Sequence, residues 1–533
     1  AYAVGSTMEN PSLTEILTDE TDAQDQGSHD KSEEERQKQR EESLKKELGD
    51  LFVPLPSLEN RVPNPPVKAK GLYLTGHSVG LKTRYDNILK LLDSTELNAL
   101  VIDVKDDHGR ITYNSEIEYV KKIDSQYLPP PISDIKEILN ELNQKDIYPI
   151  ARIVVFKDPF FAEKRHDLAI QRSDRQGMWR NNKGVAWVNP YMKEVWDYNI
   201  AIAKEVALLG FREIQFDYVR FPEGARFIEN EVHYPDNNGI AKDDIVAEFV
   251  KYAGKQLEDY DVHLAVDVFG VISSSWGDPD LIGQTWENIA PYTDYICPMI
   301  YPSHYGRGYF GFAVPDALPG ETVREALTDS IKRNAQIETP PIIRPWLQGF
   351  TATWIDGHIP YGANEVRLQI DTALKLDLDE YLIWNAGNVY PEGAFLPKIK
   401  AEERIREIKL SKEKKHLDAL GRSPQDAAEI YLDALNRGDW REVYAIQGTG
   451  FKLDPEIIRR RVGSRNIKIN GAAVAIDGGL NNDTTRLIIN LEVSIGGRNK
   501  KLIDEQWRAV MENNVWKIIP SDLFLNIMAQ AQD

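Results

Sequence analysis

The sequence predicts an α/β protein: a (β/α)8 TIM barrel with a small C-terminal α+β domain and a disordered, charged N-terminal tether. Two observations predict the barrel. Eight short apolar runs follow one another from Gly71 onward, and helix-sized amphipathic stretches separate them. A third observation argues against a doubly wound open sheet, since no G-x-G-x-x-G or Walker-type loop follows the first run.

The tether is expected over residues 1–67. The first 50 residues are dense in charge and nearly free of large apolar side chains, so they cannot bury enough surface to offset their ordering entropy. The following "VPLPSLENRVPNPPVK" is Pro-rich and suits an extended spacer. The opening Ala1-Tyr2-Ala3 is similar to the end of a signal peptide. We therefore expect an exported protein, extracellular or tethered to the cell surface.

The barrel domain is expected over residues 68–402. Amphipathic helices are predicted at 85–97, 132–146 and 190–210, where apolar residues recur every three or four positions. The eight strands are predicted at residues 71–77, 99–105, 148–156, 213–221, 263–270, 295–301, 342–350 and 380–386.

A linker helix is expected at 403–422 and a second domain at 423–533. "SPQDAAEIYLDALNRGDWREVYAIQ" predicts two amphipathic helices with Ser423 as the cap, and "RLIINLEVSIGG" and "DEQWRAVMENNVWKIIPS" predict strands after them. This order resembles the nuclear-transport-factor-like or cystatin-like accessory domains of secreted bacterial proteins. Its acidic residues fall on helix faces such as "DAAEIYLDAL", which indicates a solvated surface, so we expect a domain that binds or positions and carries no catalysis.

Composition excludes several kinds of partner. The net charge of -20 and the pI of about 5.1 argue against nucleic acid or an anionic membrane surface and favour a neutral or cationic ligand. Cys297 is the only cysteine, which excludes an internal disulfide and a thiolate metal cluster. The 11 Trp and 23 Tyr suit a cleft lined by aromatic side chains.

Charged residues stand inside three of the apolar runs. "EIQFDYVRFPEG" carries Asp217 and Arg220, and a charge buried in a strand is costly unless it is paired or has a function. If Asp217 points into the barrel, Phe216 and Tyr218 should pack outward against helices. The run "LAVDVFG" carries Asp267 in the same way.

Two carboxylates across a cleft are what hydrolysis of a glycosidic bond requires, one as nucleophile or base and the other as an acid with a raised pKa. Asp217 and Asp267 are the predicted catalytic pair. The alternative is structural: Asp217 would pair with Arg220, and Asp103 with Lys105 or Arg152.

The residue types at the other strand ends predict a cleft whose walls bind sugar. Flat aromatic rings stack on the apolar faces of pyranoses, while amides, imidazoles and charged groups bind hydroxyls. The expected substrate-binding residues are Asp103, Lys105, Arg220, Tyr301, His304, Tyr305, Trp346, Gln348, Trp384 and Asn385.

Five blocks carry a resemblance: "GLYLTGHSVG", "ALVIDVKDDHGRITY", "EIQFDYVRFPEG", "AVDVFG" and "YICPMIYPSHY". In this order they resemble a bacterial family of glycoside hydrolase barrels, formerly a domain of unknown function and distantly similar to alpha-amylase and polygalactosaminidase-like barrels. The resemblance covers residues 68–400 and implies Asp217 as nucleophile. Since no Glu stands mid-strand on the fifth strand, Asp267 must be the acid, or a loop supplies it, from Glu223 or Asp278.

The predicted function is therefore cleavage of a polysaccharide or oligosaccharide, with no cofactor and no nucleic-acid partner. One alternative is a non-catalytic protein that binds carbohydrate or serves as a scaffold. Another is a metal-dependent deacetylase using His77, His108 and His304. The sequence contains neither H-x-H nor H-E-x-x-H, which disfavours that alternative, and no metal ligands are predicted.

Overall fold

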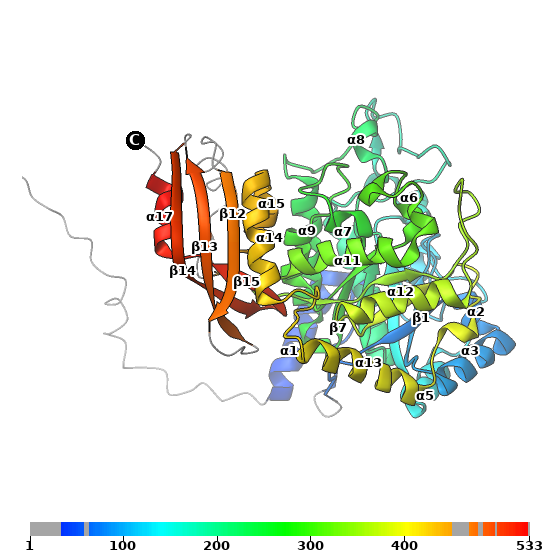
Figure 1. Cartoon of the computed structure of the whole chain (residues 1–533). Coiled ribbons are helices and arrows are strands. Elements are labelled where there is room, and N and C mark those ends of the chain that lie inside the picture. Colours follow the sequence, from blue (N-terminus) through cyan, green and yellow to red (C-terminus); the bar gives the residue numbers. More distant parts are fainter. Residues whose placement is uncertain (1–32, 58–62, 450–467, 478–482, 496–497, 531–533) are drawn as a thin grey trace, which may run out of the picture.

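The computed structural model describes residues 33–57, 63–449, 468–477, 483–495 and 498–530. Eight parallel strands form a closed barrel, in which the pairing of β8 with β10 completes the ring (Figure 1). The strands are β1 (Lys70–Leu74), β2 (Ala99–Lys105), β3 (Tyr148–Val154), β5 (Glu213–Asp217), β7 (His263–Phe269), β8 (Tyr295–Ile300), β9 (Ile342–Ile343) with β10 (Trp346–Gln348), and β11 (Tyr381–Trp384). The predicted barrel is confirmed.

The seventh strand is split into β9 and β10 by Pro345. Proline has no N–H to donate to the ladder, which interrupts a central strand. Its carbonyl still accepts from Leu382 N on β11, at 2.9 Å, so the ring stays closed across the break.

Helices cover the outside of the barrel between consecutive strands, including the three that the sequence predicts (Figure 1). They are α3 (Lys82–Ser94), α4 (Glu118–Ile123), α5 (Ile135–Gln144), α7 (Lys193–Leu209), α9 (Lys242–Leu257), α10 (Trp286–Ile289), α11 (Pro319–Asn334) and α12 (Ala363–Lys375). The short helices α2 (Gly76–Gly80), α6 (Pro159–Lys164) and α8 (Ala225–Ile228) belong to the loops after β1, β3 and β5.

Side chains of β5 alternate between the helices and the barrel interior, as expected for a strand. Ile214 and Phe216 belong to the core under the helices, where Phe216 contacts Phe249 of α9. Glu213 lies inside the barrel and pairs with Arg344, both fully buried. This alternation places Asp217, the last residue of β5, at the mouth of the barrel.

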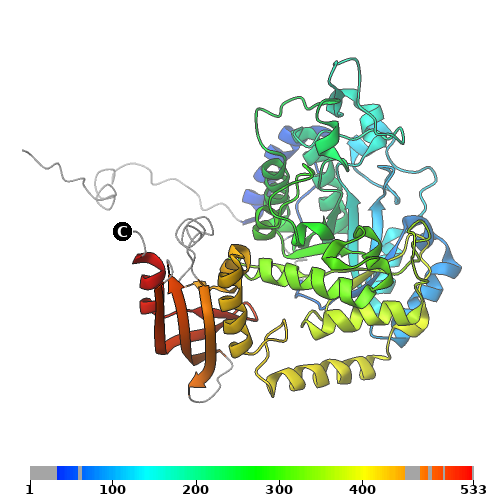
Figure 2. The same ribbon diagram turned by 45° about the horizontal axis from the view of Figure 1, so that its top comes forward.

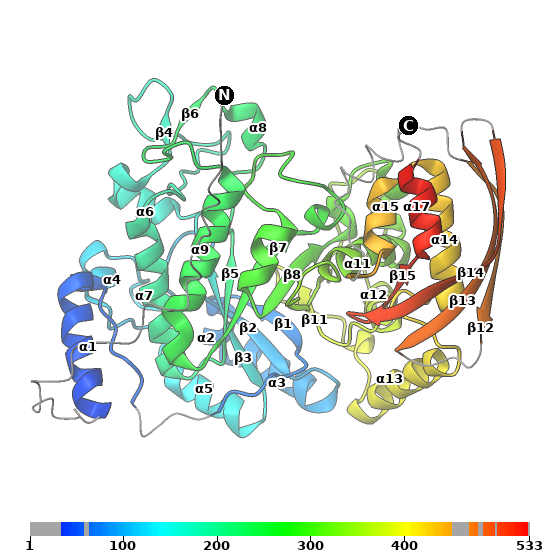
Figure 3. The same cartoon turned by 90° about the vertical axis from the view of Figure 1, so that its left-hand side faces the viewer.

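Enlarged loops rise beyond the carboxyl ends of the strands (Figure 3). The loop between β3 and α7 contains β4 (Gln171–Arg172), and the loop between β5 and α9 contains β6 (Val232–His233). These two short strands pair antiparallel, so the two loops brace each other above the barrel.

Part of the expected tether is ordered against the barrel. Residues 33–57 form α1 (Glu33–Leu48) and a short extension that buries Leu51 and Val53 in the barrel core. Arg40 of α1 also pairs with Asp259, at 2.6 Å. The segment differs from a free tether because its few apolar residues find a surface on the barrel. The same expectation for residues 1–32 lies outside the described residues.

A C-terminal domain with an antiparallel sheet follows α13 (Lys398–Glu413). It contains α14 (Pro424–Arg437), α15 (Trp440–Ile446), β12 (Lys468–Asp477), β13 (Thr484–Ile495), β14 (Arg498–Glu512), β15 (Val515–Ile519) and α17 (Asp522–Gln530), with sheet order β12-β13-β14-β15. The Ser423 hydroxyl caps α14 by accepting from Asp426 N, as predicted.

The helices of this domain lie on one face of its sheet (Figure 3), and α14 and α15 stand between the sheet and the barrel (Figures 1 and 2). The resemblance to nuclear-transport-factor-like domains stays a prediction. Among the described residues, every helix is too short or too polar to cross a membrane.

Candidate active site

A cavity of about 430 Å³ opens at the carboxyl ends of the strands, where parallel barrels carry their chemistry. Its walls come from six strands, β3, β5, β7, β8, β10 and β11, and from the loops that follow them. The lining residues are Arg152, Asp217, Tyr218, Arg220, Glu223, Asp267, Phe269, Gly270, Val271, Asp280, Met299, Tyr301, His304, Tyr305, Trp346 and Trp384.

Asp217 is oriented by the backbone directly after it. Tyr218 has a φ of 52°, a left-handed conformation that bulky residues rarely adopt, and β5 ends here rather than at Phe221 as the sequence indicated. The turn directs the Tyr218 N–H to Asp217 Oδ1, at 2.6 Å. It also brings Tyr218 to the cavity wall, which differs from the expected outward position.

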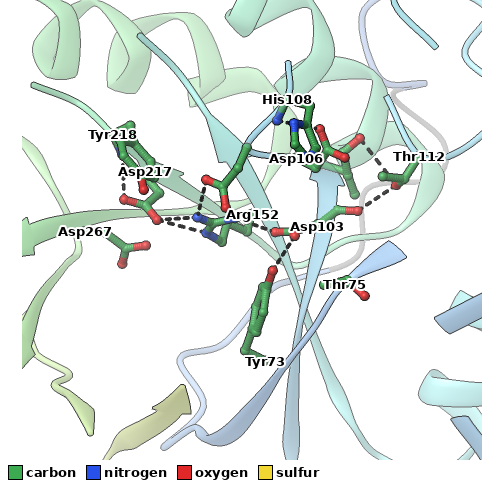
Figure 4. A network of polar contacts seen from close by, with 12 residues as sticks. Tyr73, Thr75, Asp103, Asp106, His108, Thr112, Arg152, Asp217, Tyr218 and Asp267 are labelled. Atoms are coloured by element: carbon green, nitrogen blue, oxygen red, sulfur yellow. Dashed lines mark hydrogen bonds and ion pairs between the residues drawn. The ribbon is translucent and has the colours of Figure 1, made fainter. Parts of the chain in front are cut away.

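The second oxygen of Asp217 is bound by a buried guanidinium. Arg152 donates to Asp217 Oδ2 from Nη2, at 2.6 Å, and from Nε, at 2.9 Å (Figure 4). An ion pair with two charge-assisted hydrogen bonds favours the ionised carboxylate. Asp217 is thus paired with Arg152 and is 5% exposed at the cavity wall.

Arg152 also orders the neighbouring strand end. Its Nη1 donates to Asp103 Oδ1, at 2.6 Å, and Asp103 Oδ2 accepts from the Tyr73 hydroxyl, at 2.6 Å (Figure 4). The Tyr73 ring stacks on Trp384, with centroids 3.9 Å apart. Asp103 therefore lies behind the cavity wall and positions Arg152, with the ion pair to Arg152 that the sequence left open.

Asp267 has a very different environment. It is 1% exposed, and its Oδ1 accepts from Trp346 Nε1, at 2.7 Å. Burial first, and then the charge of Asp217, raise the pKa of Asp267 well above its usual range, although the bond from Trp346 opposes the shift. Figure 4 shows its carboxyl beside that of Asp217. One carboxyl is thus paired with a cation, whereas burial raises the pKa of its neighbour.

The other acid candidates lie in less suitable environments. Glu223 lines the cavity, and although burial raises its pKa, Arg220 lowers it below the usual range. Arg220 Nη2 donates to Glu223 Oε1, at 2.7 Å, so Arg220 pairs with Glu223 and not with Asp217 as the structural alternative required. Asp278 is bound to the backbone N–H groups of Ile282 and Gly283 and holds its own loop.

Aromatic side chains form much of the remaining wall. Of the predicted sugar-binding residues, the structure brings Arg220, Tyr301, His304, Tyr305, Trp346 and Trp384 to the cavity. Trp346 and Trp384 meet edge to face, with centroids 5.7 Å apart, in an arrangement that also fixes the Trp346 N–H on Asp267.

Lys105 does not reach the cavity. Between Asp103 and Lys105 the pairing of β2 with β3 shifts register, so Lys105 turns into the helical layer. There Lys105 Nζ pairs with Asp158 Oδ2, at 2.7 Å, and donates to Asn199 Oδ1, at 3.0 Å, with both charged groups fully buried.

Gln348 and Asn385 also lie outside the lining residues, because their amides bind neighbouring loops. Gln348 is fully buried and binds the backbone of Ser303 and the carboxylate of Asp316. Asn385 donates to the carbonyls of Gly349 and Val389.

Within the residues that the structure describes, no three His, Cys, Asp or Glu side chains come together as a possible metal site. His77 instead contacts the ring of Tyr127, and His304 Nδ1 lies 3.0 Å from the Ser303 hydroxyl. Burial lowers the pKa of His304, so it faces the cavity as a neutral imidazole.

A family model with the description "Putative glycosyl hydrolase domain" matches residues 71–390, more than half of the chain. The chain belongs to this family. Every residue that lines the cavity lies inside the matched region. The chain matches none of the curated proteins.

Solved structures give more distant likenesses. A hypothetical protein from Ruminiclostridium thermocellum is 38% identical over 37% of this chain and 97% of its own, with a TM-score of 0.34. The PgaB (BpsB) glycoside hydrolase domain from Bordetella bronchiseptica is 13% identical over 61% of this chain and 95% of its own, with a TM-score of 0.41. The spore cortex-lytic enzyme SleL from Bacillus megaterium is 14% identical over 66% of this chain and 78% of its own, with a TM-score of 0.38.

Sequence reasoning missed several residues of this family's cavity. Arg152 was considered only as a partner of Asp103, although a charge inside "YPIARIVVF" is the same signal that singled out Asp217. Phe269 and Met299 gave no signal, because an apolar or aromatic residue in a strand is equally expected in the core.

Proposed function

We propose that this chain is a glycoside hydrolase in which Asp217 is the nucleophile or base and Asp267 is the general acid. The observation that carries the proposal is the pair of carboxyls in one cavity with opposite environments: Asp217 is bound by Arg152, and Asp267 is buried against Trp346. When the environments of two neighbouring carboxyls push their pKa values apart, the carboxyl with the higher pKa is assigned as the acid and the other as the nucleophile or base.

In the proposed reaction the Asp267 carboxyl gives its proton to the glycosidic oxygen while the bond from that oxygen to the anomeric carbon breaks. The Asp217 carboxylate either attacks the anomeric carbon or removes a proton from an attacking water. In both cases its negative charge stabilises the oxocarbenium-like transition state. NMR of the first-formed product anomer distinguishes retention from inversion.

The proposed substrate is a polysaccharide or oligosaccharide. Tyr301 and Trp384 offer flat apolar surfaces to a pyranose ring, and the neutral imidazole of His304 offers a hydrogen-bonding partner to its hydroxyls. The net charge of -20 favours a neutral or cationic glycan over an anionic one.

The test measures release of reducing ends from neutral and amino-sugar polysaccharides. Asp217→Asn and Asp267→Asn should each lower kcat by roughly 10² to 10⁴-fold, the usual contribution of an acid or base, while the protein stays folded. Asp93→Asn is the matched control, because Asp93 is a half-exposed surface residue that pairs with Lys145. Unchanged turnover in either active-site variant would overturn the assignment.

A non-catalytic carbohydrate-binding protein is the second candidate. The ion pair between Arg152 and Asp217 favours this second candidate, because a buried ion pair of this kind also occurs as a purely structural feature. This candidate predicts that the wild-type protein binds a glycan in affinity electrophoresis and releases no reducing ends from it.

A further inference from the structure

A second aromatic surface lies outside the cavity, on the loop between β10 and α12. Phe350 and Trp354 stack nearly parallel, with centroids 6.0 Å apart and an interplanar angle of 19°. Trp354 is 65% exposed, the most exposed tryptophan of the described residues. A large apolar ring left in water in this way often marks a binding surface.

This surface continues the cavity wall. The Phe350 ring meets Tyr301 at 5.9 Å and His304 at 6.4 Å, and both of those residues line the cavity. Two ring-to-ring steps therefore join Trp354 to the proposed catalytic cavity. Each step is comparable in length with one sugar unit of a glycan.

The loop that carries Trp354 is held at its base. Asp316 is 1% exposed and accepts from Gln348 Nε2, at 3.0 Å, while its carbonyl accepts from the Tyr361 hydroxyl, at 2.9 Å. Tyr361 N in turn donates to the Thr351 hydroxyl, at 3.0 Å. A surface that is already ordered loses little entropy when a ligand binds. Gln348 thus supports this loop.

The exposed face of Trp354 has polar groups beside it. Asp356, two residues after Trp354 on the same loop, forms an exposed ion pair with Arg307 of the loop after β8, at 3.5 Å. A pyranose presents an apolar face bordered by hydroxyls, which matches a ring with charged groups at its edge. Trp276 differs, because the guanidinium groups of Arg333 and Arg441 each lie over its ring, at 5.3 Å.

We propose that Phe350 and Trp354 form a second sugar subsite, which stacks on a pyranose ring of the same glycan chain whose neighbouring unit occupies the cavity. The inference rests on the proposed function in that the ligand is a glycan. The inference goes beyond the proposed function because it specifies a preference for chain substrates over glycosides of a single sugar.

The kinetic test compares Trp354→Ala with wild-type protein on a soluble polysaccharide and on a 4-nitrophenyl glycoside. Loss of one stacking contact should lower kcat/KM on the polysaccharide by roughly 2- to 12-fold and leave the small glycoside unchanged. Trp354→Phe, which keeps a flat ring, should recover most of the loss. Tyr292→Ala is the control: Tyr292 is 40% exposed and precedes β8, at the opposite end of the barrel.

Binding is measured without turnover in Asp267→Asn protein. Oxidation by N-bromosuccinimide, mapped by mass spectrometry, should modify Trp354 in the free protein and much less in the presence of the oligosaccharide. Trp276 serves as the internal reference, since it should be oxidised equally in both samples.

The outcomes separate this inference from the proposed function. Hydrolysis by the wild-type protein with no effect of Trp354→Ala, and no protection, overturns the subsite and leaves the catalytic assignment standing. Weaker glycan binding by Trp354→Ala in a protein that never hydrolyses supports the subsite and overturns the enzyme. No binding to any neutral or amino-sugar glycan overturns both.

Discussion

Asp217 and Asp267 are the same residue type on neighbouring strands, yet their surroundings differ. Asp217 faces a cation, Arg152, and Asp267 faces a neutral donor, Trp346. A cation stabilises a carboxylate more than a neutral N–H does, and burial penalises the carboxylate that lacks a cation. This difference in charge partner is the basis of the proposed roles.

Asp267→Asn should stabilise the protein at neutral pH. A carboxyl whose folded pKa is raised holds its proton in the folded state, while the unfolded chain releases it above about pH 4, so stability falls as pH rises from there. The variant removes this loss, and its melting temperature should exceed that of the wild type at pH 7. The difference should shrink towards pH 4. An equal melting temperature at both pH values would contradict the raised pKa.

Trp346→Phe should move the alkaline limb of the pH–rate profile to higher pH. The Trp346 N–H donates to Asp267 and stabilises its ionised form, so removing the donor raises the pKa of the acid further. The profile of kcat/KM on a small glycoside measures the shift. A limb displaced to lower pH would show that the bond favours the protonated carboxyl.

At the scale of elements, a single register shift in the pairing of β2 with β3 separates the side chains of Asp103 and Lys105. Without it Asp103 and Lys105, two residues apart, would both point into the barrel. The shift turns Lys105 outward to Asp158, whose Oδ1 also accepts from Phe161 N at the start of α6, at 2.8 Å. At the end of β2, Asp103 thus positions Arg152 of the cavity, while Lys105 forms an ion pair in the helical layer.

Lys105→Met should destabilise the fold and leave substrate affinity unchanged. The substitution leaves the buried Asp158 carboxylate without its cation, which lowers the free energy of unfolding by about 3 to 5 kcal/mol. Urea unfolding measures the loss, and the double variant with Asp158→Asn should recover much of it. KM on the polysaccharide should match the wild type in the folded fraction. A raised KM would show that Lys105 takes part in substrate binding.

At the scale of the whole molecule, the C-terminal domain has a hydrophobic core of its own, although Val515 of β15 packs into the barrel core. Polar groups of the domain also contact α11. Lys332 pairs with Glu442, at 2.8 Å, and Gln336 donates to the carbonyl of Ala445, at 3.0 Å. Polar contacts of this kind contribute little to the stability of either side.

Residues 33–415 alone should therefore fold and keep hydrolysis of a small glycoside within about twofold of the full chain. Every residue that lines the cavity lies before this end point, and the separate cores predict two thermal transitions in the full chain. Calorimetry and kcat/KM are the measurements. A barrel that keeps its circular dichroism and loses turnover would show that the C-terminal domain takes part in catalysis.

The barrel was predictable from sequence because the spacing of apolar residues is a local property of each strand and helix. The same local pattern singled out Asp103, Asp217 and Asp267, since a carboxyl inside an apolar run is visible without any tertiary information. The aromatic residues at the ends of β8, β10 and β11 were visible for the same reason.

Only the tertiary structure decided which charges pair. Arg152 binds Asp217 and Asp103, Arg220 binds Glu223, and Lys105 binds Asp158, and these choices depend on register, on a bulge and on the left-handed turn at Tyr218. Such features are set by contacts between strands and loops far apart in the sequence. The sequence alone therefore determined the barrel and its acidic strand ends, while long-range packing decided which carboxyl pairs with Arg152 and which is buried against Trp346.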